Sequence, residues 1–172
     1  MMAAAVILLG MSACKKAENQ AQQQEEIPQP ANAAEMDQVV ASLLDKLAPE
    51  DSVATRTSEI VTTPSGLKYR VVKEGTGKQP TAQDVVSVNY EGRLLDGTVF
   101  DSSYERGEPA QFPLSGVIPG WTEGLQYMKE GAVYEFYIPY NLAYGDRDNP
   151  AIPAKSDLLF KVQLLEVKAP EN

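Results

Sequence analysis

Hydrophobic and polar residues alternate along several segments in the second half of the chain, a pattern typical of half-buried β-strands. These segments are residues 67–73, 85–95, 99–100 with a continuation at 111–114, 131–140 and 157–168. Asp96-Gly97, between two of them, is a strong signal for a tight hairpin. The two long connections, 101–110 and 141–156, are where functional residues are expected, because loops on a rigid scaffold commonly carry them.

A single short helix is predicted within this strand-rich region. Pro119 suits a first helical turn, since its φ is fixed near the helical value and it has no N–H to leave unpaired. Trp121, Leu125 and Met128 follow at positions i, i+4 and i+7 and share one face of the helix. The predicted fold class is therefore α+β, a bent antiparallel β-sheet wrapped around one short α-helix. Trp121 is either the floor of a pocket or a core residue buried for packing.

The first part of the chain has a different composition. Residues 1–13 form an apolar run that is typical of a secretory signal segment and is shorter than the about 20 residues needed to span a membrane. The alternative is a buried N-terminal helix with an inert thiol at Cys14. Residues 14–33 are rich in Gln, Glu and Ala and predict a flexible tether, because few of them could bury apolar surface.

Residues 34–64 predict one amphipathic helix followed by a Ser/Thr-rich linker. The apolar residues of the helix fall at helical spacing: Met36, Val39, Val40, Leu43, Leu44 and Leu47. Pro49 ends the pattern. Since a helix of about a dozen residues is marginal alone in water, Met36–Leu47 must pack on something. Two partners are open: the chain's own globular domain, residues 65–172, and the same helix of a second copy in a homodimer.

Composition removes several classes of function. The 172 residues include no histidine, which excludes a Ser-His-Asp triad and most metal sites. Cys14 is the one cysteine, so no intramolecular disulfide can form. The net charge of −9, without a cluster of Lys and Arg, argues against nucleic acid as a partner.

Several motifs occur in order between Ser65 and Lys168. They are Val88-Asn89-Tyr90-Glu91-Gly92, Asp96-Gly97-Thr98-Val99-Phe100-Asp101-Ser102-Ser103, Arg106-Gly107-Glu108-Pro109, Val117-Ile118-Pro119-Gly120-Trp121, Leu142-Ala143-Tyr144-Gly145 and Leu158-Leu159-Phe160-Lys161-Val162-Gln163-Leu164-Leu165. Together they resemble the FKBP family of peptidyl-prolyl cis-trans isomerases, in particular its bacterial envelope branch of macrophage-infectivity-potentiator and FkpA-like proteins. Several independent motifs in register carry more weight than any single one.

The resemblance implies a prolyl pocket at named positions. Trp121 would form its floor, and Tyr144 would offer a hydroxyl to the substrate backbone. Asp101 would hold Tyr90 and Arg106 by charge-assisted hydrogen bonds. The residues implied in catalysis are Tyr90, Asp101, Trp121 and Tyr144. Those implied in substrate binding are Phe100, Arg106, Val117, Ile118 and Phe160. The backbone N–H of Ile118 would also donate to a carbonyl of the substrate.

The implied chemistry needs no acid, base, metal or cofactor. An X-Pro bond rotates over a barrier of about 18–20 kcal/mol that amide resonance sets. A dry apolar pocket disfavours the charge-separated resonance form and holds the prolyl ring while the chain rotates. Ala110 stands where the best-known eukaryotic members carry a wall phenylalanine, and Asn149 where they often carry histidine. Both differences reshape the rim and bear on affinity for macrolide inhibitors and on preference for the residue before proline.

A resemblance also indicates the location of the protein. Ser12-Ala13-Cys14 resembles a bacterial lipobox, which implies a lipidated Cys14 and a periplasm-facing protein, with Lys15 fitting anchorage in the outer membrane. The expected function is isomerisation of X-Pro bonds in unfolded or extracytoplasmic client proteins, which assists their folding. Two alternatives are open: a chaperone that grips prolyl or hydrophobic segments with little turnover, and a structural lipoprotein with an inactive isomerase-like module.

Overall fold

The computed structural model of the chain describes residues 32–47, 59–147 and 150–170. The predicted signal segment, the lipidation of Cys14, most of the tether and the rim residue Asn149 lie outside the described residues. No helix in the described ranges is both long and apolar enough to cross a bilayer.

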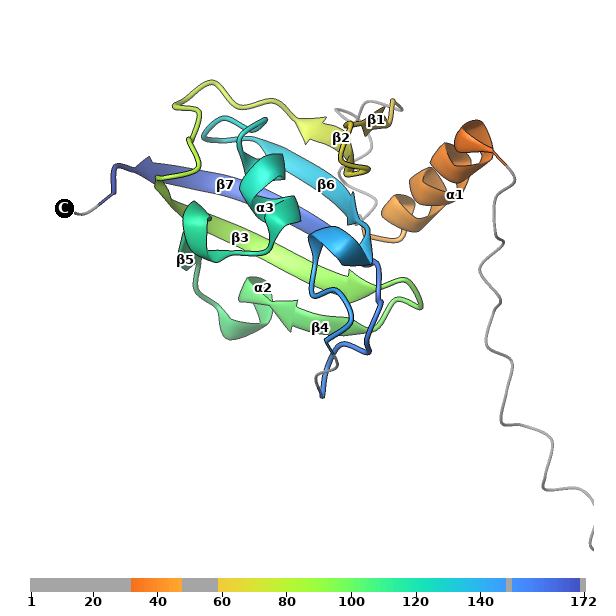
Figure 1. Cartoon of the computed structure of the whole chain (residues 1–172). Coiled ribbons are helices and arrows are strands. Elements are labelled where there is room, and N and C mark those ends of the chain that lie inside the picture. The colour runs from red at the N-terminus through yellow and green to blue at the C-terminus, as the bar shows by residue number, and fades with distance from the viewer. Residues whose placement is uncertain (1–31, 48–58, 148–149, 171–172) are drawn as a thin grey trace, which may run out of the picture.

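One antiparallel sheet dominates the described part of the chain (Figure 1). Its strands are β1 (Val61–Thr62), β2 (Lys68–Lys73), β3 (Val85–Leu94), β4 (Val99–Ser102), β5 (Ala110–Pro113), β6 (Val133–Ile138) and β7 (Leu158–Lys168). They lie in the order β1-β2-β6-β7-β3-β4, and β5 pairs with the first half of β3 while β4 pairs with its second half. The long strands β3 and β7 pair along the whole of β3 and form the centre of the sheet.

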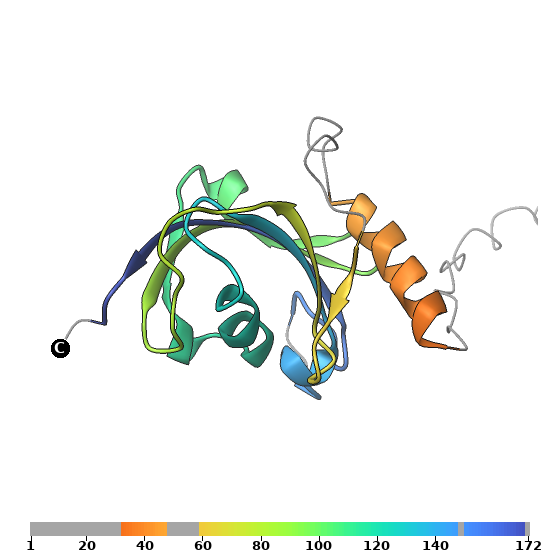
Figure 2. The ribbon, with the colours of Figure 1, turned by 90° about the horizontal axis from the view of Figure 1, so that it is seen from above.

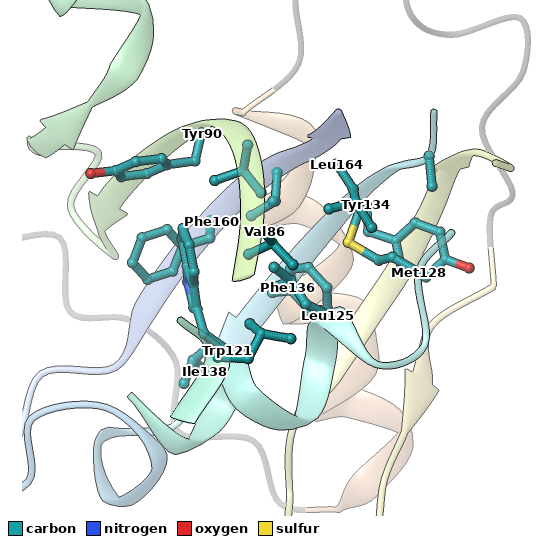
Figure 3. Close-up of a cluster of buried hydrophobic side chains, with 14 of the residues drawn as sticks. Val86, Tyr90, Trp121, Leu125, Met128, Tyr134, Phe136, Ile138, Phe160 and Leu164 are labelled. Carbon is teal, nitrogen blue, oxygen red and sulfur yellow. The ribbon is translucent and has the colours of Figure 1, made fainter. Parts of the chain in front are cut away.

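Helix α3 (Pro119–Leu125) lies inside the curve of the sheet, as Figure 2 shows. Trp121 and Leu125 on its inner face are buried, and so is Met128 just beyond the helix. Figure 3 shows them among side chains of the concave face, including Phe136, Ile138, Phe160 and Leu164. The main core therefore fills the space between α3 and the sheet. The predicted α+β fold, a bent antiparallel sheet around one short helix, is confirmed.

Helix α1 (Ala33–Asp45) covers the opposite, convex face of the sheet (Figure 2). Asn32 caps its first turn, because its Oδ1 accepts the Glu35 N–H at 2.9 Å. The apolar stripe of this helical segment forms a second core with Tyr137 of β6 and Leu159 of β7; its buried members are Val40, Leu43, Leu44 and Leu47. The predicted amphipathic helix is thus present and packs on the chain's own domain, which is the first of its two predicted partners.

Charged residues fasten α1 to β2 beside this second core. Lys68 Nζ lies 2.5 Å from Asp37 Oδ1, and Arg70 Nη1 lies 2.8 Å from Asp45 Oδ1. Arg70 also donates to Oε2 of Glu135 from Nε at 2.9 Å and from Nη2 at 2.7 Å. The Glu135 side chain is fully buried, and a buried charge is tolerated only with such a partner. Apolar packing and ion pairs therefore both hold α1 against the convex face of the sheet.

Two features of this face differ from expectation. Alternation along residues 131–140 assigns Glu135 and Tyr137 to the face away from the main core, yet both are buried, because α1 covers that face. Strand β1 lies within the segment assigned to a linker and pairs with β2 through Val61–Tyr69 and Thr62–Lys68. A strand of two residues is too short to show an alternating pattern.

Candidate functional site

Trp121 is positioned by the first turn of α3. Pro119 occupies this turn, and the Ile118 carbonyl accepts the N–H of Trp121 at 2.9 Å and that of Thr122 at 3.1 Å. The helix approaches β6 closely, since a Cβ on Gly120 would lie 2.5 Å from Ile138 Cγ2. A glycine at this position therefore permits the approach that seats the indole on the concave face, where Trp121 is 4% exposed.

Three aromatic rings surround the Trp121 indole nearly edge to face. The ring centroids of Tyr90, Phe160 and Phe112 lie 5.1, 5.3 and 5.6 Å from that of Trp121, at interplanar angles of 89°, 77° and 87°. Figure 3 shows Tyr90 and Phe160 converging on the indole from β3 and β7. Phe100 of β4 extends the cluster by meeting Phe160 at 5.5 Å and 86°. Edge-to-face contact is a preferred geometry for aromatic pairs, so the four strands supply one continuous apolar wall.

A polar triad of Tyr90, Asp101 and Arg106 lies at the rim of this cluster. The Tyr90 hydroxyl donates to Asp101 Oδ2, and Arg106 Nη1 donates to Asp101 Oδ1. Arg106 Nη2 also donates to the Tyr90 hydroxyl oxygen at 3.0 Å, and its guanidinium lies 5.5 Å from the centre of the Tyr90 ring. Each member contacts the other two. The triad therefore fixes the orientation of the Tyr90 ring against Trp121.

The short helix α2 (Ser103–Arg106) presents Arg106 to the triad. The helix begins after Ser102, whose hydroxyl accepts the Glu105 N–H at 3.4 Å. It ends at Gly107, which has a φ of +74°, a left-handed conformation that suits glycine. Ser103 is buried, and its Oγ accepts the Tyr90 N–H at 2.9 Å. The motif after β4 is thus tied to the backbone of β3 at the site itself.

The electrostatic environment keeps the site tyrosines neutral. Burial, reinforced by the hydrogen bond to Asp101, raises the pKa of Tyr90 to about 12. Burial and the charge of Asp101 also raise the pKa of Tyr144. Hydrogen bonds with Tyr90 and Asp101 raise the pKa of the Arg106 guanidinium. At neutral pH both hydroxyls are therefore donors and the guanidinium carries its charge.

The remaining predicted residues lie around this cluster. Tyr144 follows η3 (Tyr140–Leu142) and is 40% exposed, and burial followed by the charge of Asp101 raises its pKa. Val117 and Ile118, between η2 (Leu114–Gly116) and α3, are half-buried against the main core. Among the described residues, none accepts a hydrogen bond from the Ile118 N–H, so this donor can meet a carbonyl of a bound chain.

The structure brings six of the predicted residues into one connected cluster: Tyr90, Phe100, Asp101, Arg106, Trp121 and Phe160. Sequence reasoning missed Phe112, which touches both Trp121 and Tyr90. The available signal was alternation along β5, which places Phe112 on the same face as Ala110, the position that was compared with the family. A shallow hollow on the outer side of α3 shares only Val117 with the predicted set; it is lined by Ser115, Val117, Pro119, Thr122, Glu123 and Gln126.

The aromatic cluster and its rim can bind and orient a ligand. Trp121 Nε1 is buried and has no hydrogen-bond partner among the described residues, which underlines how apolar its surroundings are. Within those residues no three His, Cys, Asp or Glu side chains are grouped to hold a metal ion. The exposed Tyr144 hydroxyl and the Ile118 N–H are the donors that this part of the chain offers beside the aromatic cluster. Such a site suits a small apolar ring with a backbone carbonyl on either side.

Residues 76–165 match the model of the FKBP-type peptidyl-prolyl cis-trans isomerases. This match covers more than half of the chain and contains the whole aromatic cluster and the polar triad. The chain belongs to the family of FKBP-type peptidyl-prolyl cis-trans isomerases.

Two curated relatives and one solved structure, all three bacterial, illustrate the similarity. A probable FKBP-type peptidyl-prolyl cis-trans isomerase FkpA from Neisseria meningitidis serogroup B is 56% identical over 118 residues, which are 66% of this chain and 42% of the relative. The outer membrane protein MIP of Legionella longbeachae is 49% identical over 110 residues, which are 63% of this chain and 47% of the relative. The crystal structure of FkpA from Escherichia coli has a TM-score of 0.64 at 44% identity, covering 80% of this chain and 62% of that one. The chain thus spans less than half the length of these two curated relatives.

Proposed function

We propose that the chain catalyses cis-trans isomerisation of X-Pro bonds in unfolded or partly folded extracytoplasmic proteins and so assists their folding. The observation that carries this proposal is the Trp121 indole, held edge to face by Tyr90, Phe112 and Phe160 beside the charged pair of the rim. The same residues lie within the part of the chain that matches the family model.

The proposed mechanism needs no covalent step. A prolyl ring seated on Trp121 would be excluded from water, and the dry surroundings would disfavour the charge-separated form that gives the amide its double-bond character. The Ile118 N–H and the Tyr144 hydroxyl would hold the backbone around the rotating bond. Asp101 would act by keeping Tyr90 in place. Each contribution is partial, since no side chain transfers a proton or forms a bond.

We propose that macrolide inhibitors enter the same pocket, with an affinity set partly by β5. Ala110 is half-buried against the main core and adds little to the wall, whereas Phe112 on the same face supplies an aromatic contact to Trp121. Ala110→Phe introduces the aromatic ring that the best-known eukaryotic members carry at this position. It should tighten macrolide binding, as measured by titration calorimetry. Weaker binding of this variant would show that Phe112 already fills the wall.

We propose that the chain resides in the bacterial envelope, facing the periplasm and anchored to the outer membrane by a lipid on Cys14. The support is the apolar run of residues 1–13 that ends at Ser12-Ala13-Cys14, together with a relative whose name is outer membrane protein MIP. Two or more acyl chains anchor a protein stably where one does not. Cys14→Ser should move the protein from the membrane fraction to the soluble fraction or leave it unprocessed. A soluble wild-type protein with a titratable thiol would contradict the anchor.

A homodimer through Met36–Leu47 is a further proposal, and its geometry is constrained. Val40, Leu43 and Leu44 are buried against the sheet of the same chain, so a second copy could use them only by exchanging α1. Sedimentation of the chain from Ala31 onward, at increasing concentration, tests this exchange. A monomer at tens of micromolar leaves the intramolecular packing as the only use of the helix.

The enzyme proposal is tested with the chain from Lys15 onward in a protease-coupled assay. Its substrate is a tetrapeptide with an X-Pro bond in which X is an apolar residue. We expect exchange well above the spontaneous rate, which corresponds to tens of seconds. Trp121→Leu, shown to be folded by circular dichroism, is the matched control. A wild-type rate equal to the buffer blank, with prolyl peptide still bound, would favour the chaperone. Loss of both activities would favour an inactive module.

A further inference from the structure

The segment that carries Tyr144 is connected to the face of the sheet beneath α1. Tyr137 and Phe136 are neighbours on β6, so their side chains lie on opposite faces of the sheet. Phe136 belongs to the main core, whereas Tyr137 is buried in the second core among Leu43 and Leu44 of α1. Tyr137 is therefore on the far side of the sheet from Trp121.

The hydroxyl of Tyr137 reaches back toward the site through Asp157. It donates to Asp157 Oδ2 at 2.5 Å, and Asp157 Oδ1 accepts the backbone N–H of Tyr140 at 2.7 Å. One carboxylate thus bridges a side chain under α1 and the first residue of η3. Burial, together with the hydrogen bond to Asp157, raises the pKa of Tyr137, so its hydroxyl stays a donor at neutral pH.

Tyr140 in turn holds the backbone on both sides of Tyr144. Its carbonyl accepts the Ala143 N–H at 3.1 Å and the Gly145 N–H at 2.8 Å. The Gly145 carbonyl accepts the Lys155 N–H at 2.9 Å, which closes the base of the connection near Asp157. Since Tyr144 is itself 40% exposed, these backbone bonds are the main restraint on where its hydroxyl points.

We propose that Tyr137 and Asp157 are positioning residues for Tyr144, and that α1 supports them by packing on the Tyr137 ring. The inference rests on the proposed function, because it assigns their effect to the client-binding hydroxyl. It adds to that function a dependence on the convex face, which lies outside the aromatic site. It also gives the covering helix a role in the order of the binding segment.

The test uses Tyr137→Phe in the full chain, since this change removes the hydroxyl and keeps the ring under α1. Tyr134→Phe is the matched control: Tyr134 is a buried tyrosine of the same strand, and its hydroxyl donates instead to the Tyr127 carbonyl at 3.3 Å. We expect Tyr137→Phe to lower kcat/KM by about two- to tenfold, the range of one hydrogen bond, and Tyr134→Phe to leave it unchanged.

A double-mutant cycle with Tyr144→Phe separates positioning from general stability. If Tyr137 acts through the Tyr144 hydroxyl, Tyr137→Phe has little further effect once that hydroxyl is gone. Equal losses in the two backgrounds would overturn the proposal. Asp157 supplies a second series: Asp157→Asn keeps an acceptor for Tyr140 and a polar partner for Tyr137 and should retain activity, whereas Asp157→Ala should lose it. Equal activity of these two variants would also overturn the proposal.

Hydrogen exchange provides a readout that does not depend on catalysis. We expect the amides of Ala143 and Gly145 to exchange faster in Tyr137→Phe than in the wild type, and to be unchanged in Tyr134→Phe. If the wild type lacks isomerase activity, this comparison still tests the positioning bridge, so the two failures are distinguishable. Unchanged exchange at both amides would overturn the bridge even in an active enzyme.

Discussion

Gly92 of β3 and Phe160 of β7 lie opposite each other with no room for a methyl group between them. The two residues pair in register, and a Cβ on Gly92 would lie 2.7 Å from Phe160 Cε1 and 2.6 Å from Phe100 Cζ. The missing side chain lets Phe100 and Phe160 meet edge to face beside Trp121. This glycine, two residues after Tyr90, therefore belongs to the geometry of the aromatic wall.

Gly92→Ala should damage the wall and the stability together. The added methyl group overpacks the site, which typically costs about 1–3 kcal/mol, and it must displace both Phe100 and Phe160. We expect a lower urea midpoint and a lower kcat/KM in the protease-coupled assay. Adding Phe100→Leu removes one of the two close contacts and should recover part of the stability while activity stays low. A Gly92→Ala variant with wild-type stability and activity would show that the rings yield without consequence.

The long strands could be predicted because their alternating patterns are bounded by turn signals. The range 85–95 became β3 (Val85–Leu94), and 157–168 became β7 (Leu158–Lys168). The site residues were named from the resemblance to the family. The contact of Tyr90 with Asp101 depends in addition on the register that pairs Gly92 with Asp101. No local pattern specifies that register. The position of Phe112 likewise depends on the register of β5 against β3, which pairs Phe112 with Val86.

The partner of α1 could not be decided from its own residues. An apolar stripe shows that a helix is covered, and it fits a sheet or a second helix equally well. In the structure Lys68 and Arg70 pair with acidic residues of α1, and Arg70 also pairs with Glu135. These three residues lie on strands that are remote in sequence from the helix. The position of α1 therefore depends partly on charged residues of the sheet face that it covers.

Three substitutions separate the roles within the pocket. Trp121→Leu keeps an apolar floor with less flat area, Asp101→Val removes the partner of Tyr90 and Arg106, and Tyr144→Phe removes one hydroxyl. We expect losses of about ten- to a hundredfold at most in kcat/KM, or about 1.4–2.7 kcal/mol, with Tyr144→Phe the mildest. Circular dichroism comes first, since Trp121 also packs in the core. A folded single variant with a thousandfold loss would mean that one side chain performs an obligatory step.

The raised pKa of Tyr90 predicts a dependence of stability on alkaline pH. Folding favours the neutral phenol, so its contribution is complete below the ordinary pKa of 10.0 and is lost as the pH rises through about 12. Urea unfolding at several pH values should show stability falling over this window, and falling less in Tyr90→Phe. Part of the decline should remain, because burial also raises the pKa of Tyr134 to about 12. Identical pH profiles for the two proteins would contradict the assignment to Tyr90.

Removing one member of the buried pair of Arg70 and Glu135 should lower the free energy of unfolding strongly, whereas replacing both by apolar residues should lower it little. Glu135→Ala leaves the Arg70 guanidinium, which is 4% exposed, without its buried partner, and removal of one member of such a pair typically costs about 3–5 kcal/mol. Replacing both, with Arg70→Met and Glu135→Leu, removes the charges as well as the pair and should cost far less than Glu135→Ala. Asp45→Asn is the control, because its pair with Arg70 is 60% exposed on the Asp45 side and should contribute about 1 kcal/mol or less. Urea unfolding of the four proteins measures these differences. A Glu135→Ala variant no less stable than Asp45→Asn would mean that water reaches Arg70, and that α1 does not seal the convex face.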